Sequence, residues 1–293
     1  AFLLSALPLH ALEIQQVTPN VYAIVGPLEQ RSAENFANNA TFGVIVTSEG
    51  VVLVDTGGSW KGAQEVHATI RQITDQPVKI VINSGGQDHR WIGNDYWQQQ
   101  GAEVIASAAA VADHKDRSST QMTGLSVLLG GALEGTVPAY ADTVFETAYS
   151  FELGGIAIEI THAGQAHTPG DSFIWVPSEN TVFTGDIVYI ERIIGVGGQS
   201  HSGSWIEVFE AMAALNPEHV IPGHGDATTL ERATADTYDY LVNLRTQMGA
   251  FIEEGGDIIE SVNIDQAAWS YLENFDSLAK RNAQQVYSEM EWE

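Results

Sequence analysis

GVVLVDTGG, at residues 50–58, is a short apolar strand that stops abruptly at an acid, a threonine and two glycines. Its β-branched residues favour extended backbone, and the glycines permit a sharp turn directly afterwards. Ser59 can then cap a helix through about Ile73, because apolar side chains recur at helical spacing at Trp60, Ala63, Val66 and Ile70. Another buried strand is predicted at Val78–Ile82. The segment therefore predicts a strand–helix–strand unit with an acidic side chain at the end of its first strand.

Strands and helices alternate on both sides of this unit. Further helices are predicted at about Arg90–Gln100, Ala108–Met122 and Ser204–Leu215. Further strands are predicted at Val21–Val25, Thr41–Val46, Glu103–Ala106, Val144–Phe151, Ile156–Thr161, Ser172–Val176, Thr181–Thr184 and His219–Ile221. This order fits an α/β protein in which helices cover two β-rich halves, a layered αββα sandwich.

The domain organisation follows from the same order. We assign residues 12–228 to the sandwich and residues 229–293 to a C-terminal helical extension packed on it, with a break at Gly255-Gly256. Residues 123–141 are rich in Gly, Leu and Ala and are predicted to form a flexible flap over the site.

Acids and histidines recur where predicted strands end. Asp88 and His89 lie in the loop after one strand, and His167 lies in the segment AHTPGD at residues 166–171. Asp186 ends FTGD at residues 183–186, and His224 lies in PGHG at residues 222–225. Rigid strands fix the geometry of such loops, and neighbouring glycines let the backbone approach an ion. Imidazole and carboxylate groups are preferred zinc ligands, so the combination predicts a metal site.

These segments, taken in order, resemble the motifs of the metallo-β-lactamase superfamily over roughly residues 17–228. The resemblance implies that the metal ligands are Asp88, His89, His167, Asp186 and His224. It also implies one departure, because the family pattern H-x-H-x-D-H stands here as SGGQDH at residues 84–89. Ser84 and Gly86 occupy the places of two histidines that bind the first metal in the family.

The difference from the family pattern affects the ligands of the first metal site and leaves those of the second metal site in place. The resemblance predicts a single zinc ion per chain, held by Asp88, His89, Asp186 and His224, against the alternative of a dinuclear site. Iron or manganese are the alternative metals. The variant motif and the segment around Arg281 also resemble a periplasmic branch associated with sulfur-oxidation and quinoprotein relay systems.

The remaining roles follow from this metal assignment. A zinc-bound water has a pKa near ~7 and can attack an ester, thioester, lactone or lactam carbonyl. His167 is then available as a general base or as a donor to the oxyanion, and Asp88 is the alternative base. Other candidate residues, which would orient the site or contact substrate, are Asp55, Gln87, Arg90, His162 and His201. In particular, Arg90 is predicted to hold a substrate carboxylate. His114 is expected on a solvated helix face.

Composition restricts the partners. The net charge of −26 repels nucleic acid and anionic lipid surfaces, so a small-molecule substrate is expected. The chain has no cysteine, which excludes disulfides and thiolate ligands. Residues 1–11 are apolar and end in small or turn-forming residues, which predicts the remnant of a signal peptide and a periplasmic or secreted protein. No segment is predicted to span a membrane. The sequence leaves the oligomeric state open.

Three functions remain after this reasoning. The leading hypothesis is a zinc-dependent hydrolase. The second is an iron-dependent sulfur oxygenase, against which the absence of the two histidines counts. The third is a non-catalytic protein that binds a metal or small ligand and descends from a hydrolase.

Overall fold

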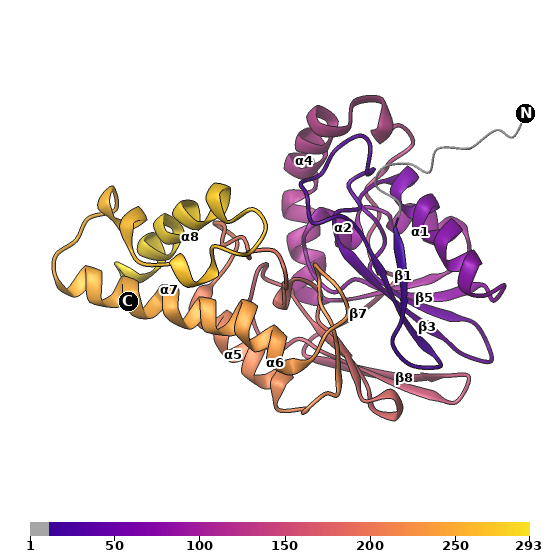
Figure 1. Cartoon of the computed structure of the whole chain (residues 1–293). Coiled ribbons are helices and arrows are strands. Elements are labelled where there is room, and N and C mark those ends of the chain that lie inside the picture. Colours follow the sequence, from indigo (N-terminus) through magenta and orange to yellow (C-terminus); the bar gives the residue numbers. More distant parts are fainter. Residues whose placement is uncertain (1–11) are drawn as a thin grey trace, which may run out of the picture.

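The computed structural model describes residues 12–293, and its core is two sheets packed face to face (Figure 1). The first sheet is seven-stranded, in the order of the chain: β1 (Glu13–Gln16), β2 (Val21–Val25), β3 (Thr41–Val46), β4 (Val51–Val54), β5 (Val78–Ile82), β6 (Glu103–Ser107) and β7 (Thr143–Phe145). Its first four strands are antiparallel, and β4 to β7 are parallel.

The second sheet is five-stranded and has the order β12-β11-β10-β9-β8. It consists of β8 (Ala148–Leu153), β9 (Ile156–Thr161), β10 (Phe173–Val176), β11 (Thr181–Phe183) and β12 (His219–Ile221). Only the β11–β12 pair is parallel. The two predicted β-rich halves are therefore confirmed.

The side chains of strand β4 pack into two different layers of the core. Its side chains alternate, so Val52 and Val54 join the apolar cluster between the sheets, and Val51 and Leu53 join the cluster beneath the helices. All four are buried, as expected for a strand covered on both faces. The predicted αββα layering is confirmed.

Helices α1 to α4 accompany the first sheet. They are α1 (Trp60–Ile73), α2 (Asp88–Trp91), α3 (Asn94–Gln99) and α4 (Ala108–Leu129). Ser59 begins α1 as predicted, because its hydroxyl accepts the backbone N–H of Gly62, a contact that is usually worth about 1 kcal/mol. Val66 and Ile70 from α1 pack on the outer face of the sheet.

Two sequence predictions in this region were wrong. Helix α4 does not end at Met122 but continues to Leu129, so residues 123–129 are helical rather than a flexible flap. Leu125 and Leu129 are buried against Trp91, which explains why the helix continues. The single helix predicted at 90–100 is two short helices, α2 and α3, separated at Gly93.

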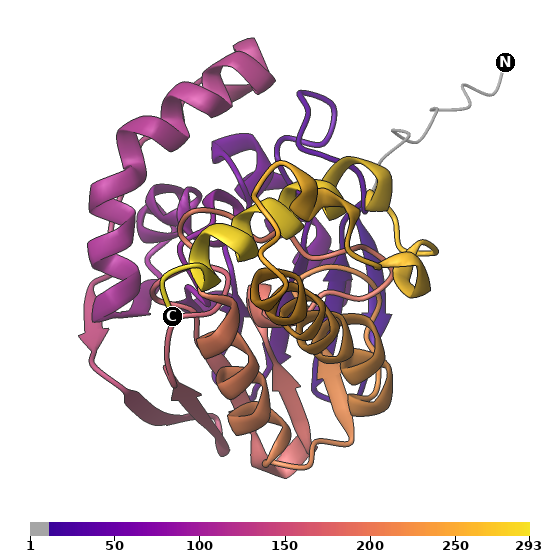
Figure 2. The same cartoon turned by 90° about the vertical axis from the view of Figure 1, so that its left-hand side faces the viewer.

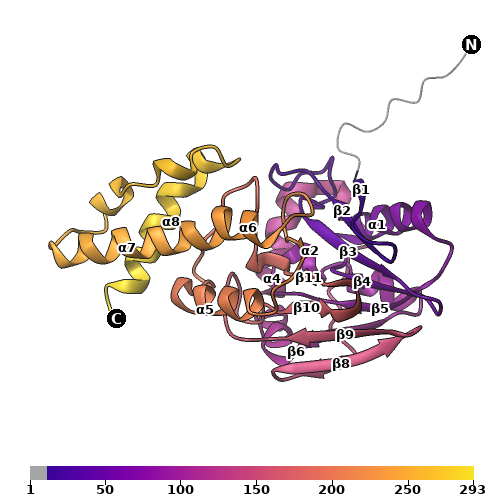
Figure 3. The same cartoon turned by 60° about the horizontal axis from the view of Figure 1, so that its bottom comes forward.

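The C-terminal part of the chain adds α5 (Ser202–Ala213), α6 (Leu230–Ala233), α7 (Asp239–Glu253) and α8 (Phe275–Met290). Figures 1 and 3 show α7 and α8 beyond one end of the sandwich, and Figure 2 looks onto that end. One cluster joins Trp205 of α5 to Leu244 of α7 and Val286 of α8. A π-helical turn at Thr234–Tyr238 links α6 to α7. Short 3-10 turns lie at Gly130–Leu133, Pro177–Glu179, Gly185–Ile187, Glu260–Asn263 and Ala267–Trp269.

No helix within residues 12–293 combines the length and apolar character needed to cross a bilayer. The predicted signal-peptide remnant, residues 1–11, lies outside the described residues.

Candidate metal centre

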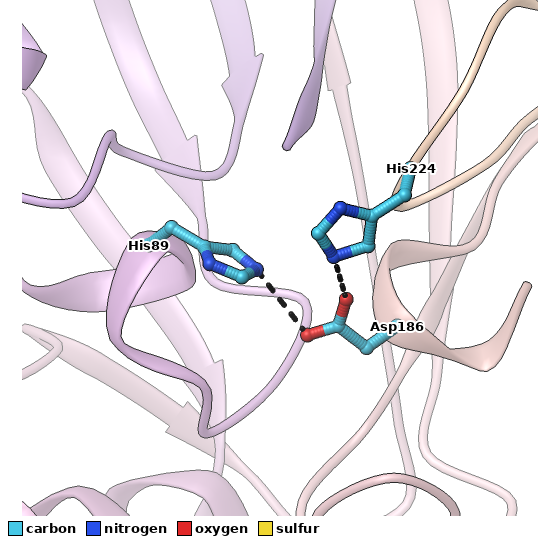
Figure 4. Close-up of side chains that lie close together, drawn as sticks. All are labelled: His89, Asp186 and His224. Atoms are coloured by element: carbon cyan, nitrogen blue, oxygen red, sulfur yellow. Dashed lines mark ion pairs between the residues drawn. The ribbon is translucent and has the colours of Figure 1, made fainter. Parts of the chain in front are cut away.

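His89, Asp186 and His224 meet at one point, and each comes from a segment that follows a strand (Figure 4). His89 lies in α2 after β5, Asp186 in the turn after β11, and His224 in the loop after β12. One ligand atom from each residue lies within 4.8 Å of the other two. All three side chains are buried. Residues nearly 140 positions apart in the chain thus form one cluster, as the motif order predicts.

The cluster contains buried polar atoms that need a partner. His89 Nε2 lies 3.5 Å from Asp186 Oδ2, and His224 Nε2 lies 3.2 Å from Asp186 Oδ1. Both ring nitrogens of His89, Nδ1 of His224 and Oδ2 of Asp186 have no hydrogen-bond partner among residues 12–293. A buried unsatisfied polar atom usually costs about 1–3 kcal/mol. A divalent ion bound by these atoms would remove that cost, so the donor set fits a metal.

The protonation states also suit a metal. Burial lowers the pKa of His224 well below its ordinary value, so the imidazole is neutral. Burial alone would raise the pKa of Asp186, but the charge of Arg90 is the largest of the effects that outweigh burial and hold that pKa well below its usual range. Two histidines and one carboxylate form a donor set of the kind found in catalytic zinc sites, which keep a further position open.

Arg90 orients Asp186 from inside the protein. Its guanidinium donates to Asp186 Oδ1 (2.7 Å), to Asp55 Oδ2 (2.9 Å) and to the carbonyls of Thr41 and Gly223. These contacts occupy Oδ1 of Asp186 and leave its Oδ2 directed at His89. Arg90 is fully buried, so the prediction that it holds a substrate carboxylate was wrong.

Asp55 fixes the loop that enters the site. It has a positive φ of 70°, which is uncommon for a residue with a side chain. Its two carboxylate oxygens accept the backbone N–H and the hydroxyl of Ser84, each at 2.8 Å. Burial raises the pKa of Asp55, although Arg90 opposes the rise. The structure thus places Asp55 where it orients both a loop and the arginine that contacts Asp186.

Ser84 and Gly86, the positions at which the resemblance expects two histidines, lie in a closely packed loop. The N–H of Gly86 donates to Thr168 Oγ1, and its carbonyl accepts from Arg117 and Gln121. A Cβ at Gly86 would lie only 1.8 Å from Asp113 Oδ2. Asp113 is itself held by Arg117 (Nε to Oδ1, 2.6 Å). This side of the site is closed by helix α4, so a histidine at position 86 would not fit without rearrangement.

Asp88, a predicted ligand and alternative base, is not brought into the three-residue cluster. Its Oδ1 accepts from Arg31 Nε and from the backbone N–H of His89, both at 2.8 Å. Burial alone would raise the pKa of Asp88, but Arg31 and His89 lower it below the ordinary value. The carboxylate is therefore ionised and already paired.

His167 also lies outside the cluster but lines the adjoining cavity. Its Nδ1 donates to the carbonyl of Gly195 at 2.9 Å, because a carbonyl can only accept. Nε2 is consequently the unprotonated nitrogen of the neutral ring. Burial lowers the pKa of His167 to about 4. The residue can accept a hydrogen bond at neutral pH but is a weak base.

The other predicted residues take different places. Gln87 lines the cavity, with its amide near Asp88. His162 donates to the carbonyl of Asp171, and His201, which is largely exposed, caps the start of α5. His114 was predicted wrongly, since it is fully buried and stacks on Trp91 with 4.4 Å between ring centroids.

Sequence reasoning missed four residues that line a cavity of about 450 Å³ beside the cluster: Arg31, Tyr189, Arg192 and Arg281. The ring of Tyr189 lies 4.3 Å from that of His224. No sequence pattern assigned these residues a role in the site, and they converge only in the folded chain. The scarcity of basic residues, 12 in all, is the one sequence signal that could have drawn attention to the arginines.

The chain is similar to proteins of one known family. A family model described as the metallo-beta-lactamase superfamily matches residues 37–224. The type 2 metallo-β-lactamase of Elizabethkingia meningoseptica is 23% identical over 221 residues, 73% of this chain and 79% of that protein.

Solved structures share the fold. A metallo-β-lactamase from Pontibacter korlensis has a TM-score of 0.63 and 20% identity, and the match covers 79% of this chain and 99% of that chain. A stereoselective inverting sec-alkylsulfatase from Pseudomonas sp. has a TM-score of 0.72 and 14% identity, with 95% of this chain and 50% of that chain covered. At these identities the structures establish similarity of fold alone.

Proposed function

The chain belongs to the metallo-β-lactamase superfamily, and from that premise we propose that it is a hydrolase with one zinc ion bound by His89, Asp186 and His224. The observation that carries the proposal is the convergence, beside a cavity, of buried nitrogen and oxygen atoms from these residues that have no hydrogen-bond partner in the described part of the chain. A structural site would be closed by a fourth protein ligand, whereas three ligands leave a position for water or substrate.

The proposed reaction is hydrolysis of an ester, thioester, lactone or lactam carbonyl in a small molecule. A bound divalent ion would supply Lewis acidity, which activates water and polarises the bond to be cleaved. The residues of the chain hold and orient the reactants. Arg90 and Asp55 fix the carboxylate of Asp186, and the cavity admits the substrate next to His89 and His224.

His167 is proposed to position the attacking water. Its Nε2 is the acceptor nitrogen of a neutral ring, and the residue lines the cavity. A base with a pKa of about 4 removes a proton poorly, so orientation through a hydrogen bond is its main contribution. Asp88 is a weaker base still, because Arg31 stabilises its ionised form. We propose that Asp88 holds the loop that carries His89, through its contact with the backbone N–H of His89.

One observation favours a second candidate. Two histidines and one carboxylate are also the donor set of non-haem iron(II) oxygenases. An iron-dependent oxidation would use the same three residues, and it differs from hydrolysis in requiring oxygen.

The test compares metals and substrates on the full chain. Protein stripped with a chelator is reloaded with Zn²⁺ or, without air, with Fe²⁺, and is assayed on a nitrophenyl ester, a thioester, a lactone and a chromogenic cephalosporin. We expect about one zinc ion per chain and hydrolysis that chelation abolishes and zinc restores. Oxygen uptake with iron alone would favour the second candidate.

A matched pair of variants completes the test. His224→Ala should lower zinc content and hydrolysis by at least about 100-fold, because it removes one of three ligands. His219→Ala, on the same strand segment but outside the cluster, should leave both unchanged. Full zinc content in His224→Ala would overturn the assignment of the site.

A further inference from the structure

The cavity beside the metal cluster has an unusual charge for this chain. Arg31, Arg192 and Arg281 line it, which is three of only 12 basic residues in a chain with a net charge of −26. No Asp or Glu is among the described residues that line it. A positive cavity in an otherwise negative protein concentrates field where a ligand would bind.

Arg192 is buried and has few polar contacts among residues 12–293. It is 6% exposed, and no carboxylate forms an ion pair with it within residues 12–293. Its Nε has no hydrogen-bond partner there, and its NH1 makes only a long bond to the carbonyl of Glu29 (3.3 Å). Burial is the largest cause that lowers the pKa of Arg192, and the charge of Arg31 adds to it, while Tyr189, Asp186 and Glu273 oppose the shift without reversing it. A buried cation without a partner is costly unless a ligand supplies the missing anion.

The backbone next to Arg192 is strained and is held by hydrogen bonds. The preceding residue, Glu191, has a positive φ of 62°, which costs about 1–2 kcal/mol for a residue with a side chain. Its N–H donates to Asp236 Oδ2 (3.0 Å), and its carbonyl accepts from the backbone N–H of Glu273 (2.8 Å). These contacts with the C-terminal extension fix a strained backbone that brings the next side chain to the cavity wall.

The other two arginines reach the same cavity from separate segments. Arg31 lies between β2 and β3, and its Nε contacts Asp88. Arg281 is an exposed residue of α8. The adjacent Asn282 anchors that helix to the cavity wall, because its amide donates to the carbonyl of Ile194 and accepts the N–H of Val196. Three chain segments thus present guanidinium groups to one space.

We propose that Arg31, Arg192 and Arg281 bind an oxyanion group of the substrate, so that the enzyme acts on small molecules that carry a carboxylate, sulfate or phosphate. This proposal rests on the proposed function for the assignment of the ligand as substrate, and on the cavity alone for the binding of the anion. The planar guanidinium matches these groups, because its donors can contact two oxygens at once.

The first experiment measures anion binding without the metal. Inorganic sulfate, inorganic phosphate and acetate are titrated by calorimetry into the full chain stripped of metal. We expect at least one of them to bind, Arg192→Gln to weaken binding about 10-fold, and Arg281→Gln to weaken it a few-fold, because each removes charge-assisted donors. Arg71→Gln, an exposed arginine of α1, removes the same charge elsewhere and should bind like the native chain.

Thermal unfolding separates a binding role from a structural one. Without added anion, Arg192→Gln should melt at or above the temperature of the native chain, because it removes an uncompensated buried charge. The anion should raise the melting temperature of the native chain but not that of the variant. A large destabilisation of Arg192→Gln, with anion binding retained in Arg281→Gln, would instead assign Arg192 to the fold and overturn the proposal.

A second arm tests the substrate directly on zinc-loaded protein. Two nitrophenyl esters are compared, one with a free carboxylate and one without. Arg192→Gln should raise KM for the anionic ester and leave KM for the neutral one unchanged. If no ester is hydrolysed but anions still bind, the proposed function fails and the anion site stands. If hydrolysis occurs but no anion binds the stripped native chain and KM is unaffected, only the anion site fails.

Discussion

The site has two sides that differ in whether their polar atoms are hydrogen-bonded. The satisfied side lies next to Ser84 and Gly86, and the unsatisfied side consists of His89, Asp186 and His224. On the first side, Ser84 is bonded to Asp55, and Gly86 is bonded to Thr168 and Arg117. On the second side, several buried nitrogen and oxygen atoms lack a partner within residues 12–293. The polar groups of the first side are therefore bonded within the protein, whereas the buried nitrogen and oxygen atoms of the second side fit a bound ion.

Asp186→Asn should produce the largest effect, because it weakens the unsatisfied side in two ways. It reduces the charge that binds the ion, and it leaves Arg90 buried with only Asp55 as an ionic partner. We expect zinc content to fall at least about 10-fold and the free energy of unfolding to fall by about 3–5 kcal/mol, as measured by elemental analysis and urea unfolding. Asp226→Asn, an exposed acid, is the control. An unchanged free energy of unfolding in Asp186→Asn would contradict this prediction, because the ion pair between Arg90 and Asp186 would then contribute nothing to stability.

Ser84→His combined with Gly86→His tests whether the satisfied side is really closed. The new side chain at position 86 would collide with Asp113, so we expect about 3 kcal/mol of destabilisation and still one ion per chain. Adding Asp113→Ala relieves the collision and should recover part of the stability. Two tightly bound ions in the double variant, before Asp113 is changed, would mean that α4 does not block the first site.

His114→Phe tests the satisfied side with a smaller effect. His114 donates to the carbonyl of Gly85, and burial, assisted by Arg117, lowers its pKa to about 4. The unfolded chain, with a histidine pKa near 6.5, binds the proton first, so the native chain loses stability as pH falls from about 6.5 towards 4. Between pH 7 and pH 5 this residue accounts for about 2 kcal/mol. The phenylalanine variant keeps the contact with Trp91 and should lose correspondingly less stability over that interval in urea unfolding. Equal pH dependence in both proteins would contradict the pKa shift of His114.

The sequence was sufficient to predict the helices and strands that depend on a local pattern of residues. The apolar strand at Val51–Val54 and the cap at Ser59 were predicted correctly, and the order of strands and helices predicted the layers. The order of motifs also predicted that His89, Asp186 and His224 would meet.

Other features depend on contacts that no local pattern encodes. Asp88 meets Arg31, which is 57 residues away in the chain, and this contact takes one of its oxygens away from the metal cluster. His114 stands in a charged segment, yet packing against Trp91 buries it. The arginines of the cavity come from three segments that are far apart in the sequence, and only one of them, α8, belongs to the C-terminal helices.

Arg90 has a consequence for how the protein matures. Because it contacts Asp186 from within the core, this carboxylate has a compensating charge before any ion arrives. We therefore expect the polypeptide to complete its fold before an ion binds. On that expectation the ion would leave and be replaced without unfolding, and the supply of metal, rather than synthesis of new chain, would set how much of the protein is loaded.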